Sequence, residues 1–193
     1  MIAIAAAAAS LVAGCSSLGP VSPGAGPRGL DYLNDDLGSM ALAFDVPVTL
    51  EPAPAGSTLS FAVSVPGAGE RRVSAVLVRG DAGDVMATLP PPADERTYYV
   101  FALSPEDAGK LREAQGWARA RAMEGTAPST PVISIAPRFC QTARVDAART
   151  MVSVRLVLPQ RGLATALIES QSVATLLAAE GGGTLPDCAG HSG

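Results

Sequence analysis

Few side chains in this sequence have the types and spacing that catalysis or metal binding requires. The 193 residues include three cysteines and a single histidine, His191, which follows the last cysteine in a short Gly- and Ser-containing tail. A serine or cysteine nucleophile needs an imidazole or a similar base held beside it. The sequence contains neither a Gly-x-Ser-x-Gly turn nor a His-Glu-x-x-His helix. It therefore predicts no catalytic residue, no metal site and no cofactor.

Three arginines stand close together in the sequence and could bind an anion. Arg138, Arg144 and Arg149 flank Cys140 in a segment between two predicted strands. Guanidinium groups that converge can bind a carboxylate or a phosphate through paired hydrogen bonds. We interpret these residues as ordinary exposed loop arginines and keep a small-anion site as the alternative.

The first residues form an apolar segment that ends in the sequence Leu11-Val12-Ala13-Gly14-Cys15. This pattern resembles the lipobox of bacterial lipoproteins. The resemblance implies a signal peptide over residues 1–14, cleavage after Gly14 and a diacylglyceryl group on the Cys15 thiol. No Lys or Arg precedes the apolar run, which departs from the usual signal peptide. An alanine-rich core helix that ends in a cysteine is the alternative.

The resemblance also implies a location and a layout of the chain. In that family an aspartate after the lipidated cysteine retains the protein in the inner membrane, whereas this chain has Ser16 there. We therefore expect a lipid anchor at the periplasmic face of the outer membrane. Residues 15–29 would carry the lipid and form a flexible tether, because they are rich in Gly, Pro and Ser. Residues 30–193 would form a single globular domain with a short disordered C-terminal tail.

Two cysteines remain once Cys15 carries the lipid. In the oxidising compartment that the resemblance implies, Cys140 and Cys188 are most simply a disulfide. The bond would fasten the C-terminal tail beside the strand that ends near Phe139. A metal-binding pair or a redox pair is the alternative, although such sites usually have closely spaced cysteines or histidine partners.

Alternation of apolar and polar residues is the main structural signal in the rest of the chain. A period of two places the apolar set on one face of a strand. This alternation, together with short apolar runs, predicts six strands, at 42–50, 59–65, 73–77, 98–103, 132–136 and 152–158. The turn sequence Pro66-Gly67-Ala68-Gly69 predicts that the second and third strands pair as a hairpin. Pro47 would lie on an edge or at a bulge, since proline cannot donate to a ladder.

Helical signals are fewer. Ser104 and Pro105, followed by acidic residues, predict the start of a long helix over about 104–124, which ends at Gly125. A second, shorter helix is expected within 163–180, with a strand near Leu167 as the alternative for part of it. The fold class predicted is therefore mainly β, an antiparallel sandwich with two added helices, and an α+β fold is the alternative.

Composition and charge limit the kinds of partner. The formal charge of −4 gives no basic surface for nucleic acid. Trp117 and the pair Tyr98-Tyr99 could be interface anchors, but with only 4% aromatic residues they are expected in the core or half-buried.

These observations favour a non-catalytic binding or assembly module of the cell envelope, with the membrane and an envelope protein as partners. Such a module predicts an exposed apolar patch or an unpaired strand edge. A carboxylate-based envelope hydrolase would instead need a cleft with two acids about 5 to 10 Å apart. A carrier of small anions would use the three arginines around Cys140.

Overall fold

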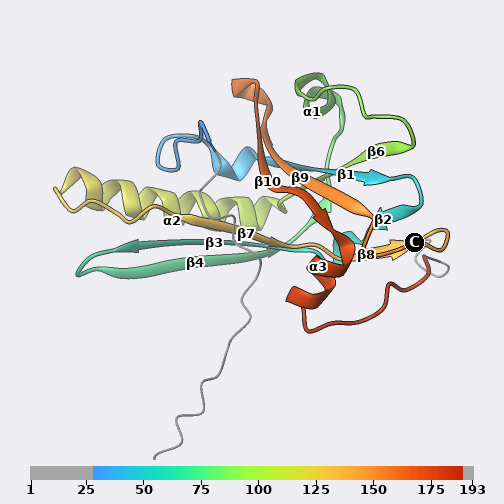
Figure 1. Cartoon of the computed structure of the whole chain (residues 1–193). Coiled ribbons are helices and arrows are strands. Elements are labelled where there is room, and N and C mark those ends of the chain that lie inside the picture. Colours follow the sequence, from blue (N-terminus) through green and yellow to red (C-terminus); the bar gives the residue numbers. More distant parts are fainter. Residues whose placement is uncertain (1–27, 189–193) are drawn as a thin grey trace, which may run out of the picture.

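The computed structural model describes residues 28–188 (Figure 1). The lipobox residues, Cys15, most of the predicted tether and His191 lie outside the described residues. Within this range the chain forms antiparallel β-sheets and three α-helices. The predicted mainly β, antiparallel class is confirmed, in the form of a β-rich α+β fold.

A five-stranded antiparallel sheet forms one layer. Its strands, in spatial order, are β10 (Leu163–Ser172), β9 (Met151–Leu158), β1 (Ala41–Pro47), β6 (Arg96–Ala102) and β5 (Val78–Arg79). The central strand β1 pairs with β6 on one side and with β9 on the other, so Ala41 lies opposite both Ala102 and Val157. Segments far apart in the sequence therefore meet along β1.

A three-stranded sheet forms the second layer, and a two-stranded sheet lies beside it. The three strands, in spatial order, are β4 (Gly69–Val76), β3 (Thr58–Val65) and β7 (Val132–Ala136), and the two-stranded sheet pairs β2 (Leu50–Pro52) with β8 (Phe139–Gln141). The predicted hairpin is confirmed as the β3–β4 pair. Its turn needs glycine because Gly67 and Gly69 have φ of +74° and +93°, a region that other residues rarely adopt.

The long helix predicted by the sequence is α2 (Pro105–Met123), and it packs on β3 and β4 (Figure 1). Its first turn is capped by Ser104, whose side chain accepts a hydrogen bond from the backbone of Asp107. Two short helices complete the set, α1 (Gly83–Thr88) and α3 (Val173–Ala179). No helix in the described part of the chain combines the length and apolarity needed to cross a membrane.

The main hydrophobic core lies between the two large sheets and under α2. Phe44 is fully buried there, with its ring edge-on to Phe101 at 5.0 Å and to Phe139 at 6.3 Å between centroids. The opposite face of the five-stranded sheet carries a smaller core, where Ala43 packs near Val85 of α1. Since side chains alternate along a strand, β1 supplies both cores from successive residues.

Several predicted elements differ from the structure. The described residues contain ten strands in three sheets rather than about six strands. The helix expected within 163–180 is Val173–Ala179, and the strand near Leu167 that was the alternative for part of this range is β10. Strand β10 carries two register shifts, and such bulges break the period-two pattern that identifies a strand. Pro47 ends a central strand instead of lying on an edge, at a position where the ladder stops.

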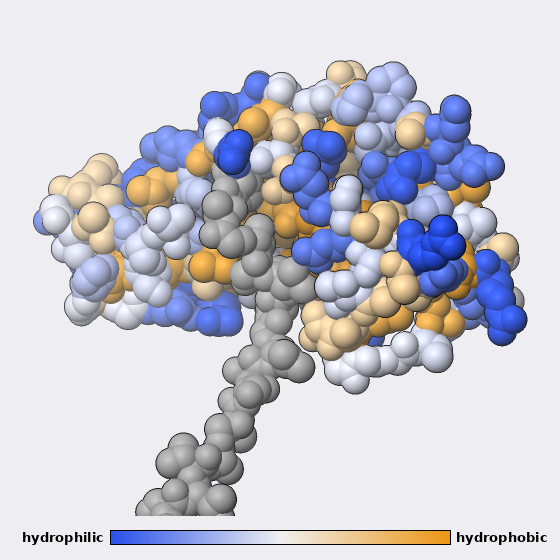
Figure 2. Space-filling view, viewed as in Figure 1, coloured by the Kyte–Doolittle hydropathy of each residue, from blue (hydrophilic) through white to orange (hydrophobic). Residues whose placement is uncertain are grey.

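The surface carries few large apolar side chains. On the face shown in Figure 2, hydrophilic residues surround small hydrophobic patches. The exposed large hydrophobic residues are spread over several elements, namely Val48, Val76, Val78, Met86, Met123, Val132 and Met151. A binding surface is therefore better sought in the shape and the edges of the sheets than in a single apolar patch.

Candidate binding groove

The side chains of helix α2 form three faces that meet other parts of the domain. The helical repeat of 3.6 residues determines which side chains share a face. The first face, which includes Leu111 and Ala118, is buried in the main core. The second holds the segment that precedes β1. The third faces strand β4 across a groove that charged and aromatic side chains line.

The second face fixes residues 31–36 against α2. Gln115 is buried, and its Nε2 donates to the carbonyl oxygens of Tyr32 and Asp35 at 2.7 and 2.9 Å. Four residues further along α2, Arg119 donates to the carbonyl oxygen of Leu33 at 2.9 Å. These contacts hold α2 in place and so define one wall of the groove.

The other wall is the free edge of β4. Within residues 28–188, β4 pairs only with β3, in an unbroken register over all eight of its residues. Leu77 donates its amide to the carbonyl of Ser57, which continues this register. Because hydrogen-bonded and non-hydrogen-bonded pairs alternate in an antiparallel ladder, the backbone groups of four residues point away from β3. These residues are Glu70, Arg72, Ser74 and Val76.

The remaining edges of the large sheets are shorter or irregular. β5 has two residues, β7 has five, and β10 carries two bulges. Short strands and bulges are common ways to prevent further pairing at an edge. β4 has neither protection, although charged residues at its N-terminal half serve the same purpose there.

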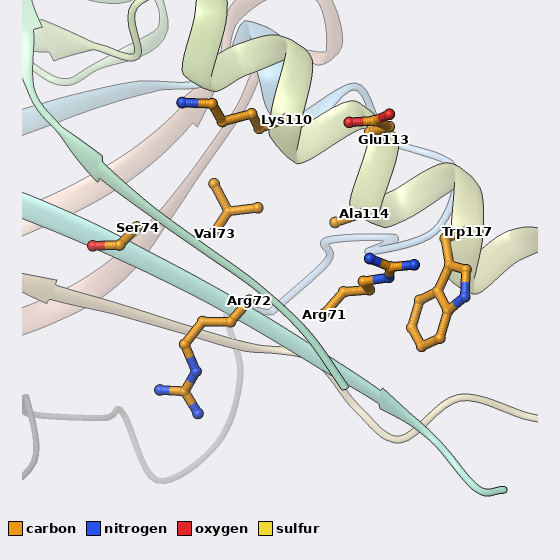
Figure 3. A pocket seen from close by; sticks show the side chains of 8 residues that line it. All are labelled: Arg71, Arg72, Val73, Ser74, Lys110, Glu113, Ala114 and Trp117. Carbon is orange, nitrogen blue, oxygen red and sulfur yellow. The ribbon is translucent and has the colours of Figure 1, made fainter. Parts of the chain in front are cut away.

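The groove between β4 and α2 has a volume of about 450 Å³. Figure 3 shows the side chains that line it, with those of α2 on one wall and those of β4 on the other. The lining residues are Arg71, Arg72, Val73, Ser74, Lys110, Glu113, Ala114 and Trp117. Residues from both faces of β4 appear in this set, so the groove wraps around the free edge of the strand.

Arg71 is the cation that the structure leaves most available in this groove. Its guanidinium carbon lies 5.4 Å from the centroid of the Trp117 ring, a cation–π contact that joins strand to helix. Such contacts contribute about 0.5–1 kcal/mol at exposed sites. Arg71 is exposed, and no carboxylate in the described part of the chain forms an ion pair with it.

The two other cations of the groove have acidic partners. Arg72 lies 2.9 Å from Glu70 on the outer face of the sheet. Lys110 contacts Glu106 at 2.7 Å and Asp107 at 3.1 Å on its own helix. These contacts raise the pKa of the Lys110 amine, chiefly through the hydrogen bond with Glu106. Both side chains thus already form ion pairs within the domain in the absence of a ligand.

The groove has the features of a binding site rather than of a reaction centre. Glu113 is the one carboxylate among its lining residues, whereas acid–base hydrolysis of the kind considered above needs two. The floor is made of small and apolar side chains, including Val73 and Ala114. A groove with an apolar floor, an aromatic wall and one available cation can bind an extended ligand and fix its position.

The structure places the three arginines of the candidate anion site in different surroundings. Arg138 pairs with Glu180 at 2.8 Å, and its side chain packs over Gly56. Arg144 and Arg149 are exposed in the loop between β8 and β9. None of the three lines a pocket that the structure describes. The anion-binding role of these residues stays a prediction.

The two cysteines of the domain are joined. The sulfurs of Cys140 and Cys188 lie 2.14 Å apart, which is a bonding distance. Cys140 is on β8, and the tail runs beside it, since the amide of Cys188 donates to the carbonyl of Gln141 at 2.9 Å. The Glu51 carboxylate lies within 4.8 Å of both sulfurs, but sulfurs in a disulfide offer no thiolate to a metal.

Of the groove residues, sequence reasoning considered only Trp117 as a candidate interface anchor, and it expected this residue in the core or half-buried. The structure places Trp117 half-buried on the groove wall. The run Glu70-Arg71-Arg72 at the start of a strand was a usable signal, because charged residues mark an edge. Nothing in the sequence indicates that this edge lies against α2, about 40 residues later in the chain. Comparison with known protein families, curated proteins and solved structures finds no match to this chain.

Proposed function

We propose that this protein is a non-catalytic binding or assembly module of the bacterial cell envelope, held at a membrane by a lipid on Cys15. Its binding surface is the groove between β4 and α2. The single observation that carries the proposal is the free edge of β4, which borders this groove at residues 71–74. The expected localisation is the periplasmic face of the outer membrane.

The packing around the groove supports a role in binding. The two walls are held by different interactions: the β3–β4 ladder fixes one, and the contacts of Gln115 and Arg119 with residues 31–36 fix the other. A pre-formed site loses less conformational entropy when its ligand binds. The groove is therefore a pre-formed site in which Arg71, against Trp117, is the cation without an ion-pair partner among the described residues.

The disulfide supports an envelope location. Bonded cysteines persist in oxidising compartments such as the periplasm and are rare in the cytosol. Two separate parts of the chain favour export. They are the lipobox resemblance at Leu11–Cys15 and the bond between Cys140 and Cys188. A membrane anchor would hold the groove close to partners on the same surface.

Photocrosslinking in living cells tests the groove. A photoreactive amino acid replaces Glu113, an exposed residue of the groove wall, and in a matched variant it replaces Arg149, exposed on the β8–β9 loop. Both variants keep Cys15. We expect one dominant crosslinked envelope protein from position 113 and none from position 149. Crosslinks from position 149 alone, or from neither position, would overturn the assignment of the groove.

A second arm tests the anchor separately. Cys15→Ser removes the acceptor of the lipid and leaves the folded domain unchanged. Metabolic labelling with an alkyne fatty acid should mark the original protein and not this variant. If the original protein takes no label, the lipid anchor is wrong, whatever the crosslinks show.

A further inference from the structure

We propose that the ligand of this groove is an extended protein segment that pairs with β4 as an added strand. The segment carries an acidic side chain and an apolar side chain two residues apart. This inference rests on the proposed function, because it specifies what the groove binds. It follows from the backbone, the side-chain register and the charges of β4.

The backbone of β4 supplies the hydrogen bonds. The amide and carbonyl groups of Arg72, Ser74 and Val76 point away from β3, into the space where a further strand would lie. The described residues provide no backbone partner for these groups. Addition of a strand to such an edge is a recurrent way to recognise extended peptides, in which the main chain supplies affinity and alternate side chains supply specificity.

The side chains of β4 determine what the added segment carries. Arg71, Val73 and Ala75 point to the inner face of the sheet, where the register pairs them with Val63, Phe61 and Leu59 of β3. A ligand residue directly opposite one of them shares its face and lies within side-chain contact. The residue opposite Val73 meets Ala114 on α2, a small side chain that leaves room for an apolar group.

The charge of Arg71 determines which ligand residue fits opposite it. Opposite-charge pairs across a sheet are favourable, and like charges directly opposite each other are unfavourable. Arg71 is the groove cation without a carboxylate partner in the described residues, whereas Arg72 and Lys110 are already paired. A carboxylate two residues from the apolar position reaches Arg71, since inward-facing positions of a strand recur every second residue.

Peptide binding to the folded domain tests this inference directly. The probes are fluorescein-labelled Thr-Glu-Thr-Val-Thr-Val-Thr and its reverse, which present the same spacing in the two strand directions. Two controls replace Glu with Lys or N-methylate the backbone amides of the peptide. Fluorescence anisotropy should show binding of one of the two probes. Both controls should weaken it, because one reverses the charge and the other removes donors to the β4 carbonyls.

Variants of β4 separate backbone pairing from side-chain contact. Ser74→Pro removes an outward amide and keeps the ladder to β3, and Ser74→Thr is the matched control that keeps the amide. We expect Ser74→Pro to weaken peptide binding about tenfold, as the loss of a hydrogen bond predicts, and Ser74→Thr to leave it unchanged. Arg71→Glu should weaken it by about tenfold or more. Circular dichroism verifies that each variant is folded.

The outcomes distinguish this inference from the proposed function. Crosslinking from position 113 that persists in Ser74→Pro, or peptide binding that survives N-methylation, would overturn strand addition while the groove remains the binding site. Failure of both probes to bind would do the same. If position 113 gives no crosslink in a chain that is otherwise unchanged, both proposals are overturned. If Ser74→Pro does not fold, binding of the N-methylated peptide to the original protein tests strand addition instead.

Discussion

Replacing Gln115 with leucine tests how the segment before β1 is held on α2. The Gln115 side chain is 3% exposed, and its amide donates to two backbone carbonyls of that segment, those of Tyr32 and Asp35. Leucine has a similar volume and cannot donate. The Tyr32 carbonyl then loses the one hydrogen-bond partner that the described residues give it, whereas the Asp35 carbonyl still accepts from the Leu37 amide at 2.9 Å.

The size of the effect follows from these contacts. Each neutral hydrogen bond contributes about 1 kcal/mol, and a buried carbonyl left without a partner costs about 1–3 kcal/mol. We therefore expect Gln115→Leu to lower the free energy of unfolding by about 3 kcal/mol. The control is Arg112→Ala, which removes the ion pair with Asp36. Both of those side chains are about half exposed, so this pair contributes at most about 1 kcal/mol.

Urea unfolding followed by circular dichroism measures both variants. A shift of the midpoint at constant slope reports a change in stability alone. Hydrogen exchange should show faster exchange of residues 31–36 in Gln115→Leu. If Arg112→Ala destabilises the domain more than Gln115→Leu, the exposed charges matter more than the buried amide, and our reasoning about the α2 wall is wrong.

Three further predictions concern the rest of the domain. Replacing Cys140 and Cys188 together with serine should lower the free energy of unfolding by up to about 4 kcal/mol, because the bond closes a loop with a sequence separation of 48; urea unfolding with and without reductant checks this. Burial raises the pKa of the Glu180 carboxyl above 4.5, and Arg138 opposes this less strongly. The native state therefore binds the proton more tightly than the unfolded state, and stability falls as the pH rises above 4.5. Glu180→Gln should thus raise the melting temperature at pH 7 relative to the original protein but not near pH 4, and equal shifts at both would contradict this. Phe44→Leu should cost about 1–3 kcal/mol in thermal unfolding, since it removes two edge-on aromatic contacts from the core.

The elements that the sequence predicted well have strong local signals. Helix α2 starts at the predicted cap because Ser104 and Pro105 determine its first turn whatever surrounds them. Strand β3 matches its predicted range because its side chains keep a strict alternation, and β7 does so because its short apolar run is bounded by Pro131 and Pro137. The hairpin follows from the glycines in its turn. In each of these cases the information lies within a few residues.

The elements that the sequence predicted poorly lack such signals. Strand β10 is interrupted by bulges, so its buried residues follow neither a period of two nor a period of 3.6. Helix α1 is six residues long and lies among glycines and aspartates that are typical of turns. The short strands β2 and β8 form a sheet only because each meets the other about 90 residues away.

The amino-acid sequence was sufficient to predict a β-rich domain with one long capped helix, two cysteines able to form a bond, and a lipobox-like start. The long free edge of β4, and the position of α2 beside it with Arg71 against Trp117, became known only from the folded domain. Strand pairing depends on backbone groups, which are the same in every residue except proline. Which strands pair, and which edge stays open, is therefore settled by how the whole chain buries its apolar side chains.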